Sequence, residues 1–293
     1  MTRKIIVTGG LGFIGSHLVK KLTNLNYQIF VIDNFSSPSS NRLPGSISVI
    51  RQDIADSKLV DTIQKIKPAV IYHLAAESRV SGTLDKIIHN NIIGTYNVLE
   101  AAKAAQVKQL IFTSSAAVYG EVRNFPIQET SALKPISLYG LSKLTGELYC
   151  RQFKKFFPTV IFRLANVYGP FQNSSAEGGV VPIFLNQIQR GITPLIYGNG
   201  QQTRDFIHVS DVVTAMIRAL SFSQSGIFNI STGQETTINQ LLKLCGNGKT
   251  KLKAKLVPAR GRDIVRSVLA NHLAVKNLHW QPKVKLADGL LSL

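Results

Sequence analysis

Short runs of β-branched and apolar residues alternate with segments of helical spacing along the first half of the chain. The runs that predict buried strands are residues 4–8, 28–32, 47–50, 69–74 and 109–113. Apolar positions recur at helical spacing over residues 16–22 and again over residues 91–105. Strands that alternate with helices in this way predict right-handed βαβ units, a parallel sheet and a ligand site at the carboxyl ends of the strands.

A glycine-rich turn follows the first predicted strand. Residues 9–15 read GGLGFIG and lead directly into a segment of helical spacing. Glycine lets the backbone turn tightly and approach a pyrophosphate, and the helix N-terminus offers N–H donors and partial positive charge to the phosphates. A glycine triplet alone is weak evidence. Its position between a strand and a helix is the arrangement that a dinucleotide-binding site requires.

The second predicted strand ends at Asp33. A carboxylate at this position accepts hydrogen bonds from the adenosine ribose and repels a 2′-phosphate, so it favours NAD over NADP. The alternative is that Asp33 only caps a loop with Asn34 and Ser36. Asp53 follows the third predicted strand and is placed to approach the adenine, although aspartate is also an ordinary turn residue there.

Three further residues suit the oxidation of an alcohol. Tyr139 and Lys143 are four apart on a predicted helix, so they share one face. A nearby ammonium group and a positively charged nicotinamide both favour the phenolate of Tyr139, which lowers its pKa towards neutral pH. Ser115, at a strand end, can hydrogen-bond the reacting oxygen. A Tyr-x-x-x-Lys pair is also common on solvated helix faces; the glycine turn, Asp33 and the strand-end serine favour catalysis here.

With these residues in place, the chain resembles the extended short-chain dehydrogenases/reductases, and within them the UDP-hexose 4-epimerases. The matching stretches are residues 8–18, 73–78, 91–95, 114–120, 163–170 and 204–209. They extend to about Gly233 and, more loosely, to Pro282. The resemblance implies NAD as a bound cofactor that is returned unchanged, and a nucleotide-activated sugar as the substrate.

The resemblance also assigns roles by position. Positions that match cofactor contacts are Gly9, Gly12, Phe13, Ile14, Gly15, Asp33, Asn34, Ser36, Asp53, Ile54, Leu74, Ala75, Ala76, Asn91, Tyr139 and Lys143. Positions that match catalytic groups are Ser115, Tyr139 and Lys143. Positions that match substrate contacts are Glu77, Ser115, Asn166, Val181, Tyr197, Arg204, Arg260, Asp263 and Ser267. The arginines among them suit a diphosphate because a guanidinium is always charged and binds in a bidentate manner.

The expected fold is α/β, a Rossmann-type doubly wound parallel sheet with a smaller mixed α/β C-terminal substrate lobe. We expect residues 1–170 to form the NAD-binding domain, joined by about 204–232, which return to its sheet. Residues 171–203 and 233–293 are expected to build the lobe that binds the nucleotide sugar.

The resemblance favours one reaction over its relatives. In the epimerases the 4-ketosugar stays bound, turns over and takes the same hydride back on its other face. Related 4,6-dehydratases carry an acid and a base just after the strand-end hydroxyl, where this chain has Ala116 and Ala117. The leading hypothesis is therefore NAD-dependent 4-epimerisation of a UDP-hexose. A second is another nucleotide-sugar oxidoreductase, a reductase or a dehydratase with displaced acid and base. A third, a non-catalytic protein that binds NAD or nucleic acid, is disfavoured by the intact catalytic residues.

The resemblance extends to the sugar. In these epimerases the residue four positions after the one matching Asp263 lines the sugar pocket, and a small residue there admits an N-acetyl group. Ser267 holds this position, which implies UDP-GlcNAc and UDP-GalNAc as substrates alongside UDP-Glc and UDP-Gal. Arg262 stands where the family usually has glycine, so the register around Ser267 stays open.

The formal net charge of +18 is the unusual feature of the composition. Such an excess can indicate nucleic acid, an anionic membrane surface or an anionic small substrate. The basic residues are spread along the chain and belong to no nucleic-acid-binding motif, so we expect neither a nucleic-acid nor a membrane partner.

Other features exclude several classes. The two cysteines lie far apart and do not predict a disulfide framework, and the six histidines lack metal-ligand spacing, so no metal is expected. No apolar run is long enough to cross a bilayer, and the first residues do not resemble a signal peptide, so we expect a cytoplasmic protein. The helices that contain Asn91 and Tyr139 resemble those that pair in this family, which implies a homodimer through a four-helix bundle.

Overall fold

The computed structural model describes residues 3–36, 43–78, 83–173, 179–246, 253–259, 261 and 263–293. Seven parallel strands form the central sheet in the order β11-β6-β5-β4-β1-β2-β3. They are β1 (Lys4–Thr8), β2 (Gln28–Asp33), β3 (Ser48–Arg51), β4 (Val70–His73), β5 (Gln109–Ser115), β6 (Thr159–Leu164) and β11 (Gly226–Ile230). The predicted doubly wound α/β fold is confirmed.

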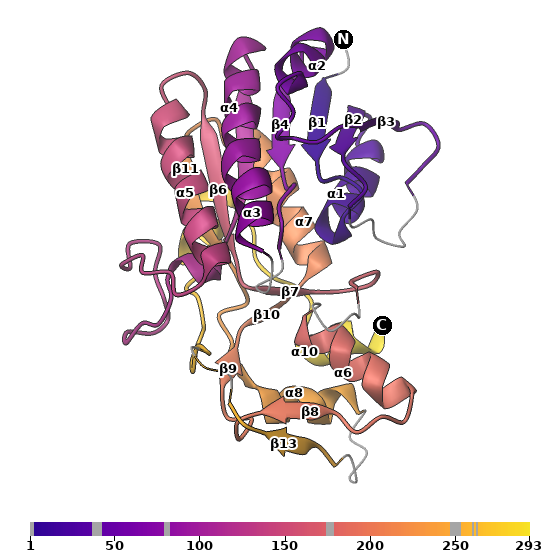
Figure 1. The fold of residues 1–293 in the computed structure, drawn as a ribbon, viewed down its shortest axis with the longest axis vertical. Coiled ribbons are helices and arrows are strands. Elements are labelled where there is room, and N and C mark those ends of the chain that lie inside the picture. The colour runs from indigo at the N-terminus through magenta and orange to yellow at the C-terminus, as the bar shows by residue number, and fades with distance from the viewer. Residues whose placement is uncertain are drawn as a thin grey trace.

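Helices cover both faces of this sheet (Figure 1). On one face lie α1 (Phe13–Thr23), α7 (Val209–Arg218) and α9 (His272–Leu278), and on the other lie α2 (Leu59–Ile66), α4 (Gly94–Ala104) and α5 (Leu138–Phe153). Alternating side chains of β1 show the two layers. Ile5 and Val7 pack with Leu18 of α1, whereas Ile6 packs in the other core with Ile63 of α2. Side chains of successive strand residues point to opposite faces, so a strand covered on both sides is apolar throughout.

The predicted helix over residues 91–105 differs most from the structure. The helical segment begins earlier, as α3 (Leu84–Ile87), continues through the π-helical turn η1 (Ile88–Ile93) and then becomes α4. Asn91 lies inside the π turn, with its side chain buried and bonded to neighbouring segments. Turns of this kind interrupt α-helices most often at functional sites. The turn thus directs a polar side chain inward at a point where the local spacing predicts a regular helix.

Smaller elements lie beyond the carboxyl edge of the sheet, in the lower part of Figure 1. Three strand pairs are formed by β7 (Asn166–Tyr168) with β10 (Phe206–His208), β8 (Leu195–Tyr197) with β13 (Lys255–Val257), and β9 (Thr203–Arg204) with β12 (Thr236–Thr237). The helices here are α6 (Val180–Gln189), α8 (Ile238–Cys245) and α10 (Leu286–Leu291). A separate apolar core that includes Phe184, Ile196 and Leu241 holds them together.

Two single-turn 3-10 helices complete the structure, η2 (Ala116–Val118) and η3 (Ala219–Ser221). Of the helices in the described part of the chain, none combines the length and the apolar character needed to cross a membrane.

Candidate active site

The glycine turn is packed too closely for other residues. A Cβ added to Gly15 would lie 2.1 Å from the carbonyl oxygen of Gly9, and one added to Gly9 would lie 2.7 Å from the backbone of Ala75. The N-cap of α1 is Gly12, which makes no side-chain cap. The amide of Ser16 is the first in the helix to bond four residues back, so the amides of Phe13 and Ile14 point out of the N-terminus. These donors and the helix dipole fit a dinucleotide diphosphate.

Asp33 is hydrogen-bonded to the glycine turn, beside which it is predicted to bind the cofactor. Its carboxylate accepts hydrogen bonds from the amides of Leu11, at 3.0 Å, and Phe35, at 2.8 Å. Asn34 donates to Asp53 at 2.9 Å, which joins the ends of β2 and β3. Asp33 therefore caps the loop that follows it, as the alternative interpretation requires, and it also organises the glycine turn. The remaining acceptor capacity of this carboxylate suits the hydroxyls of an adenosine ribose.

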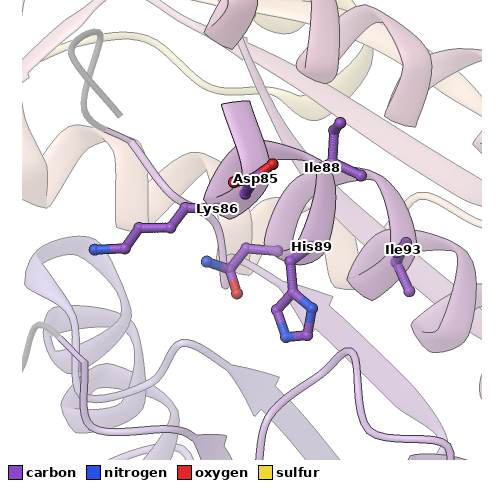
Figure 2. A pocket seen from close by; sticks show the side chains of 6 residues that line it. Asp85, Lys86, Ile88, His89 and Ile93 are labelled. Atoms are coloured by element: carbon purple, nitrogen blue, oxygen red, sulfur yellow. The ribbon is translucent and has the colours of Figure 1, made fainter. Parts of the chain in front are cut away.

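The expected adenosine end also borders an open hollow of about 460 Å³ beside α3 and η1. Its lining residues are Asp85, Lys86, Ile88, His89, Asn90 and Ile93. Figure 2 shows the side chains of Lys86 and His89 extending outward from the helix. His89 reaches to 3.5 Å from a carboxylate oxygen of Asp53, which connects the hollow to the expected cofactor site. The hollow contains none of the three predicted catalytic residues.

The segment after β4 is fixed by Asn91. Asn91 accepts a hydrogen bond from the amide of Glu77 at 2.7 Å and donates to its carbonyl at 3.0 Å and to the hydroxyl of Ser142 at 2.9 Å. All of its hydrogen-bonding groups are thereby used. Asn91 thus joins the predicted contacts at residues 74–77 to the helix that carries the catalytic residues. Asn91 therefore holds these two neighbouring segments together.

The structure brings Ser115, Tyr139 and Lys143 together at the end of β5. The Tyr139 phenol lies within interaction range of the Ser115 side chain. Lys143 donates to the carbonyl of Thr113 at 2.9 Å, and its ammonium lies 5.9 Å from the centroid of the Tyr139 ring. The N-cap Ser137 starts α5 by accepting from the amide of Gly140, which sets the helix so that residues 139 and 143 face the strand. A hydroxyl, a phenol and an ammonium therefore converge on one point.

A buried ion pair behind these groups was not predicted. Glu147 and Arg163 are both 0% exposed, and Arg163 donates to the two carboxylate oxygens at 2.9 and 2.6 Å. Ser114 donates to Glu147 at 2.6 Å, and Arg163 donates to Tyr119 at 3.0 Å. Residues 139, 143 and 147 of α5 therefore all contact the last three residues of β5, namely Ser115, Thr113 and Ser114 respectively. The repeated spacing of four from Tyr139 is the signal by which Glu147 could have been found.

The remaining predicted substrate residues come from several separate segments. Arg204 and Asp263 form an ion pair at 2.6 Å, and the amide of Thr203 donates to the carbonyl of Val265 at 3.0 Å, so these two segments lie side by side. Val181 is buried in the core of the lower elements, while Tyr197 lies at the end of β8. Asn166 is exposed on β7. Arg260 lies outside the described residues.

Residues 127–129 connect the segment of Ser267 to the buried ion pair of Arg163 on β6. Ser267 is buried, and the next residue, Val268, accepts a hydrogen bond from the amide of Ile127 at 2.9 Å. Two residues farther along the same loop, the carbonyl of Glu129 accepts from Arg163 at 2.9 Å. The expected sugar pocket is thus coupled to the ion pair behind the catalytic residues through residues 127–129.

Comparison with known proteins decides the family. Residues 5–231, more than half of the chain, match the NAD dependent epimerase/dehydratase family. The chain belongs to this family. The resemblance to extended short-chain dehydrogenases/reductases is therefore confirmed, and the protein is an NAD-dependent enzyme of the epimerase/dehydratase type.

Individual family members are similar over nearly the whole chain. The UDP-glucose 4-epimerase of Thermotoga maritima, solved with UDP-glucose, is 38% identical with a TM-score of 0.94, over 99% of this chain and 96% of that one. The UDP-N-acetylglucosamine 4-epimerase of Methanobrevibacter ruminantium, solved with UDP-N-acetylmuramic acid, is 32% identical with a TM-score of 0.93, over 99% and 96%. The human dTDP-D-glucose 4,6-dehydratase is 30% identical over 98% of this chain and 88% of its own length.

The pKa of Tyr139 in the folded polypeptide differs from the sequence expectation. Burial raises the pKa of Tyr139 to about 12, against the smaller opposing effect of its interaction with the Ser115 side chain. Burial also lowers the pKa of Lys143 to about 8. The expected lowering of the tyrosine pKa by its lysine neighbour is therefore wrong for the protein's own groups, because desolvation dominates. NAD⁺, which the glycine turn would hold, would supply a hydride acceptor and a positive charge.

Proposed function

We propose that this protein catalyses the NAD-dependent 4-epimerisation of a UDP-hexose. The observation that supports it best is the convergence of Ser115, Tyr139 and Lys143 next to Ala116 and Ala117, two side chains that cannot transfer protons. The similar epimerases described above, one solved with UDP-glucose, support a UDP-sugar substrate. The ion pair of Arg204 provides a guanidinium that suits a diphosphate.

In the proposed reaction, Tyr139 accepts the proton of the sugar 4-hydroxyl when it is ionised. Ser115 donates a hydrogen bond to the same oxygen and stabilises the developing carbonyl. Lys143 provides a positive charge near the phenolate, which favours its formation. NAD⁺, held at the glycine turn, would accept the hydride that leaves C4 and return it to the opposite face of the same carbon. Between these events the 4-ketosugar turns over while its diphosphate stays bound, and Tyr139 returns the proton to the same oxygen.

Dehydration of the sugar is the second candidate, favoured by the 30% identity to the human 4,6-dehydratase. A dehydratase needs a second acid and base near C5 and C6 of the sugar. The two alanines after Ser115 do not supply them. Glu77, a predicted substrate contact, is a buried carboxylate whose backbone is linked through Asn91 to Ser142 of the catalytic helix, and it is a candidate for such a role.

The experiment that tests the function is a proton NMR time course of the purified NAD-loaded protein with UDP-GlcNAc and, in parallel, with UDP-Glc. We expect new anomeric signals of the galacto epimer, with no change in mass and no accumulation of NADH. Loss of one water from the sugar would identify a dehydratase instead. If a folded, NAD-loaded protein converts neither sugar, the proposal is wrong.

Substituting Ser267 tests the proposed acceptance of N-acetylated sugars. We propose that this buried side chain lines the sugar pocket, so Ser267→Tyr should remove turnover of UDP-GlcNAc by at least about 10-fold more than turnover of UDP-Glc. Steady-state kinetics on both sugars measures the ratio. Val265→Tyr is the matched control, because Val265 is 63% exposed on the same segment and should leave both activities unchanged. Equal loss on both sugars in the Ser267 variant would contradict the assignment.

We also propose a homodimer through helices α4 and α5. These helices and the adjoining turn expose large apolar residues to solvent, namely Ile88, Ile93, Tyr96, Leu141 and Leu148. Residues 141 and 148 are seven apart on α5 and therefore share one face. Two copies that join these faces form a four-helix bundle.

A charge placed in this face should separate the protomers. We expect Leu148→Glu to convert the dimer to a monomer, measured by light scattering during gel filtration, because a buried carboxylate without a partner opposes association. Leu256→Glu, at an exposed leucine on β13, is the control and should remain dimeric. A native protein that elutes as a monomer at micromolar concentration contradicts this proposal.

A further inference from the structure

The end of the sheet opposite the active site gathers positive charge. The five helices α1, α2, α4, α5 and α7, which pack on the sheet, each have a basic residue in the last turn. At this edge the residues are Lys21, Lys65, Lys103, Arg151 and Arg218, whereas the ammonium of Lys20 lies 5.7 Å from the centroid of the Phe171 ring, after β7. In a parallel α/β fold the C-termini of the helices and the N-termini of the strands share one edge. This amino edge lies at the upper end of Figure 1, away from the substrate lobe.

Further cations stand in the loops that lead into the strands. They are Arg3 before β1, Lys67 before β4, Lys108 before β5, and Lys154 and Lys155 before β6, and all are exposed. Backbone hydrogen bonds place these loops side by side. The amide of Lys108 donates to Ala69 at 2.8 Å, and the amide of Ala69 donates to Lys4 at 2.9 Å. Neighbouring strands are about 4.8 Å apart, so the row of loop cations is continuous across adjacent strands.

The amino edge lacks compensating negative charge in the segments that build it. Residues 20–28, 63–69, 101–108, 150–158 and 215–225 contain no aspartate or glutamate. Among the described residues, an ion pair near these segments joins Lys103 to Glu100, with its atoms 3.5 Å apart. Favourable interaction with the helix dipole accounts for cations in a last turn, but it falls off within that turn. It does not account for the loop cations or for the missing carboxylates.

An aromatic side chain stands among these cations. Phe156 is 48% exposed, and the ammonium groups of Lys103 and Lys155 lie 4.8 and 5.1 Å from its ring centroid. An exposed phenylalanine surrounded by lysines, whose long stems are apolar, combines an apolar tip with a ring of positive charge. Peripheral proteins use this combination at the boundary between lipid headgroups and acyl chains.

We propose that the amino edge, formed by these basic residues and Phe156, docks on the surface of an anionic lipid bilayer. Clusters of four to eight basic residues bind anionic lipids by charge, and a broad row suits a plane better than a narrow site. A protein that binds single-stranded nucleic acid needs a succession of aromatic side chains on which the bases stack. In the described segments of this edge, Phe156 is the exposed aromatic side chain. Docking at this edge leaves the candidate active site facing the solution, where its substrate is found.

This proposal revises the expectation of no membrane partner. That expectation rested on the basic residues, which are spread along the sequence and form no single cluster in it. The fold collects them, because each βα unit contributes one helix end and one strand entry to the same edge. The association is peripheral, by charge and one aromatic ring.

Flotation with lipid vesicles tests the proposal on the NAD-loaded protein. The probes are vesicles of phosphatidylglycerol and phosphatidylcholine in a ratio of one to three, and vesicles of phosphatidylcholine alone. We expect binding to the anionic vesicles only, lost at high salt because screening weakens exposed charges. The variant Lys67→Gln/Lys103→Gln/Lys108→Gln/Lys155→Gln should bind roughly 100-fold more weakly or worse, while its epimerase or other sugar-nucleotide activity stays unchanged.

The matched control changes the net charge equally at another place. Lys243, Lys253, Lys255 and Lys285 are exposed lysines of the lower elements, and their fourfold change to glutamine should leave vesicle binding within about threefold of native. Phe156→Ser should weaken binding to anionic vesicles without affecting the salt dependence. Equal weakening by both fourfold variants, no vesicle binding by the native protein, or binding to an unstructured RNA but not to vesicles would each overturn the proposal.

Discussion

Tyr139→Phe should lower kcat by about 1000-fold while NAD stays bound. Positioned proton transfer contributes about 100- to 10,000-fold to an enzymatic rate, and the phenol of Tyr139 is the group that meets Ser115 at the end of β5. The ring itself is retained in the variant, so packing is preserved. Tyr149→Phe is the matched control, because it removes a phenol from the same helix without touching Ser115 or Lys143. Initial rates by NMR, together with the cofactor content of each variant, measure the effect.

The pH dependence of the native enzyme provides an independent check on this role. Burial raises the pKa of Tyr139 to about 12, so the protonated phenol predominates at neutral pH in the protein's own environment. The reactive form is the phenolate, and kcat should therefore rise with pH on the alkaline side of neutrality. Tyr139→Phe should lose this dependence. A residual rate in Tyr139→Phe that keeps the native pH profile would assign the proton transfer to another group.

Replacing Arg163 with methionine should destabilise the folded protein by about 3–5 kcal/mol. The substitution leaves Glu147 fully buried without its partner, and an unpaired buried charge has a cost of this order. Urea unfolding followed by fluorescence measures the change. Arg266→Met, which breaks the solvent-exposed pair with Glu235, is the control and should have a far smaller effect.

The double variant Arg163→Met/Glu147→Leu separates stability from alignment. It removes both charges and should recover much of the stability, because apolar residues of similar volume can replace a buried pair. It also removes the acceptor of the Ser114 hydroxyl, so we expect kcat to stay reduced while KM changes little. Full recovery of kcat together with stability would show that the pair only holds the fold.

Local patterns predicted the sheet and the nucleotide-binding turn well. Runs such as residues 4–8 are apolar on both sides because helices cover both faces of the sheet. The boundaries of the five predicted strands agree with the structure within two residues, whereas β6 was not predicted. The glycine turn was visible because it depends on adjacent residues. Tyr139 and Lys143 were recognised because helical spacing fixes their relative position.

The features that local patterns missed depend on contacts between distant segments. Glu147 meets Arg163 and Ser114 only once β5, β6 and α5 are assembled. The π turn at Asn91 forms around bonds to Glu77 and Ser142, which no helical spacing reveals. The high pKa of Tyr139 reflects burial, a property of the folded chain. The concentration of cations at one edge likewise arises from topology and not from any run of residues.

The catalytic residues and most of the predicted substrate contacts lie on different segments of the chain. This separation affects how the substrate specificity can change. Ser115, Tyr139 and Lys143 all come from strand β5 and helix α5, two neighbouring elements whose alignment is set by contacts within the sheet domain. The predicted substrate contacts Arg204, Asp263 and Ser267 belong to segments outside these two elements. Insertions, deletions or exchanges in those segments can therefore alter which sugar is admitted without displacing the proton-transfer groups. Chimaeras that exchange residues 233–267 between relatives, and so keep α9 on the sheet, are accordingly a promising route to new substrates on an unchanged catalytic frame.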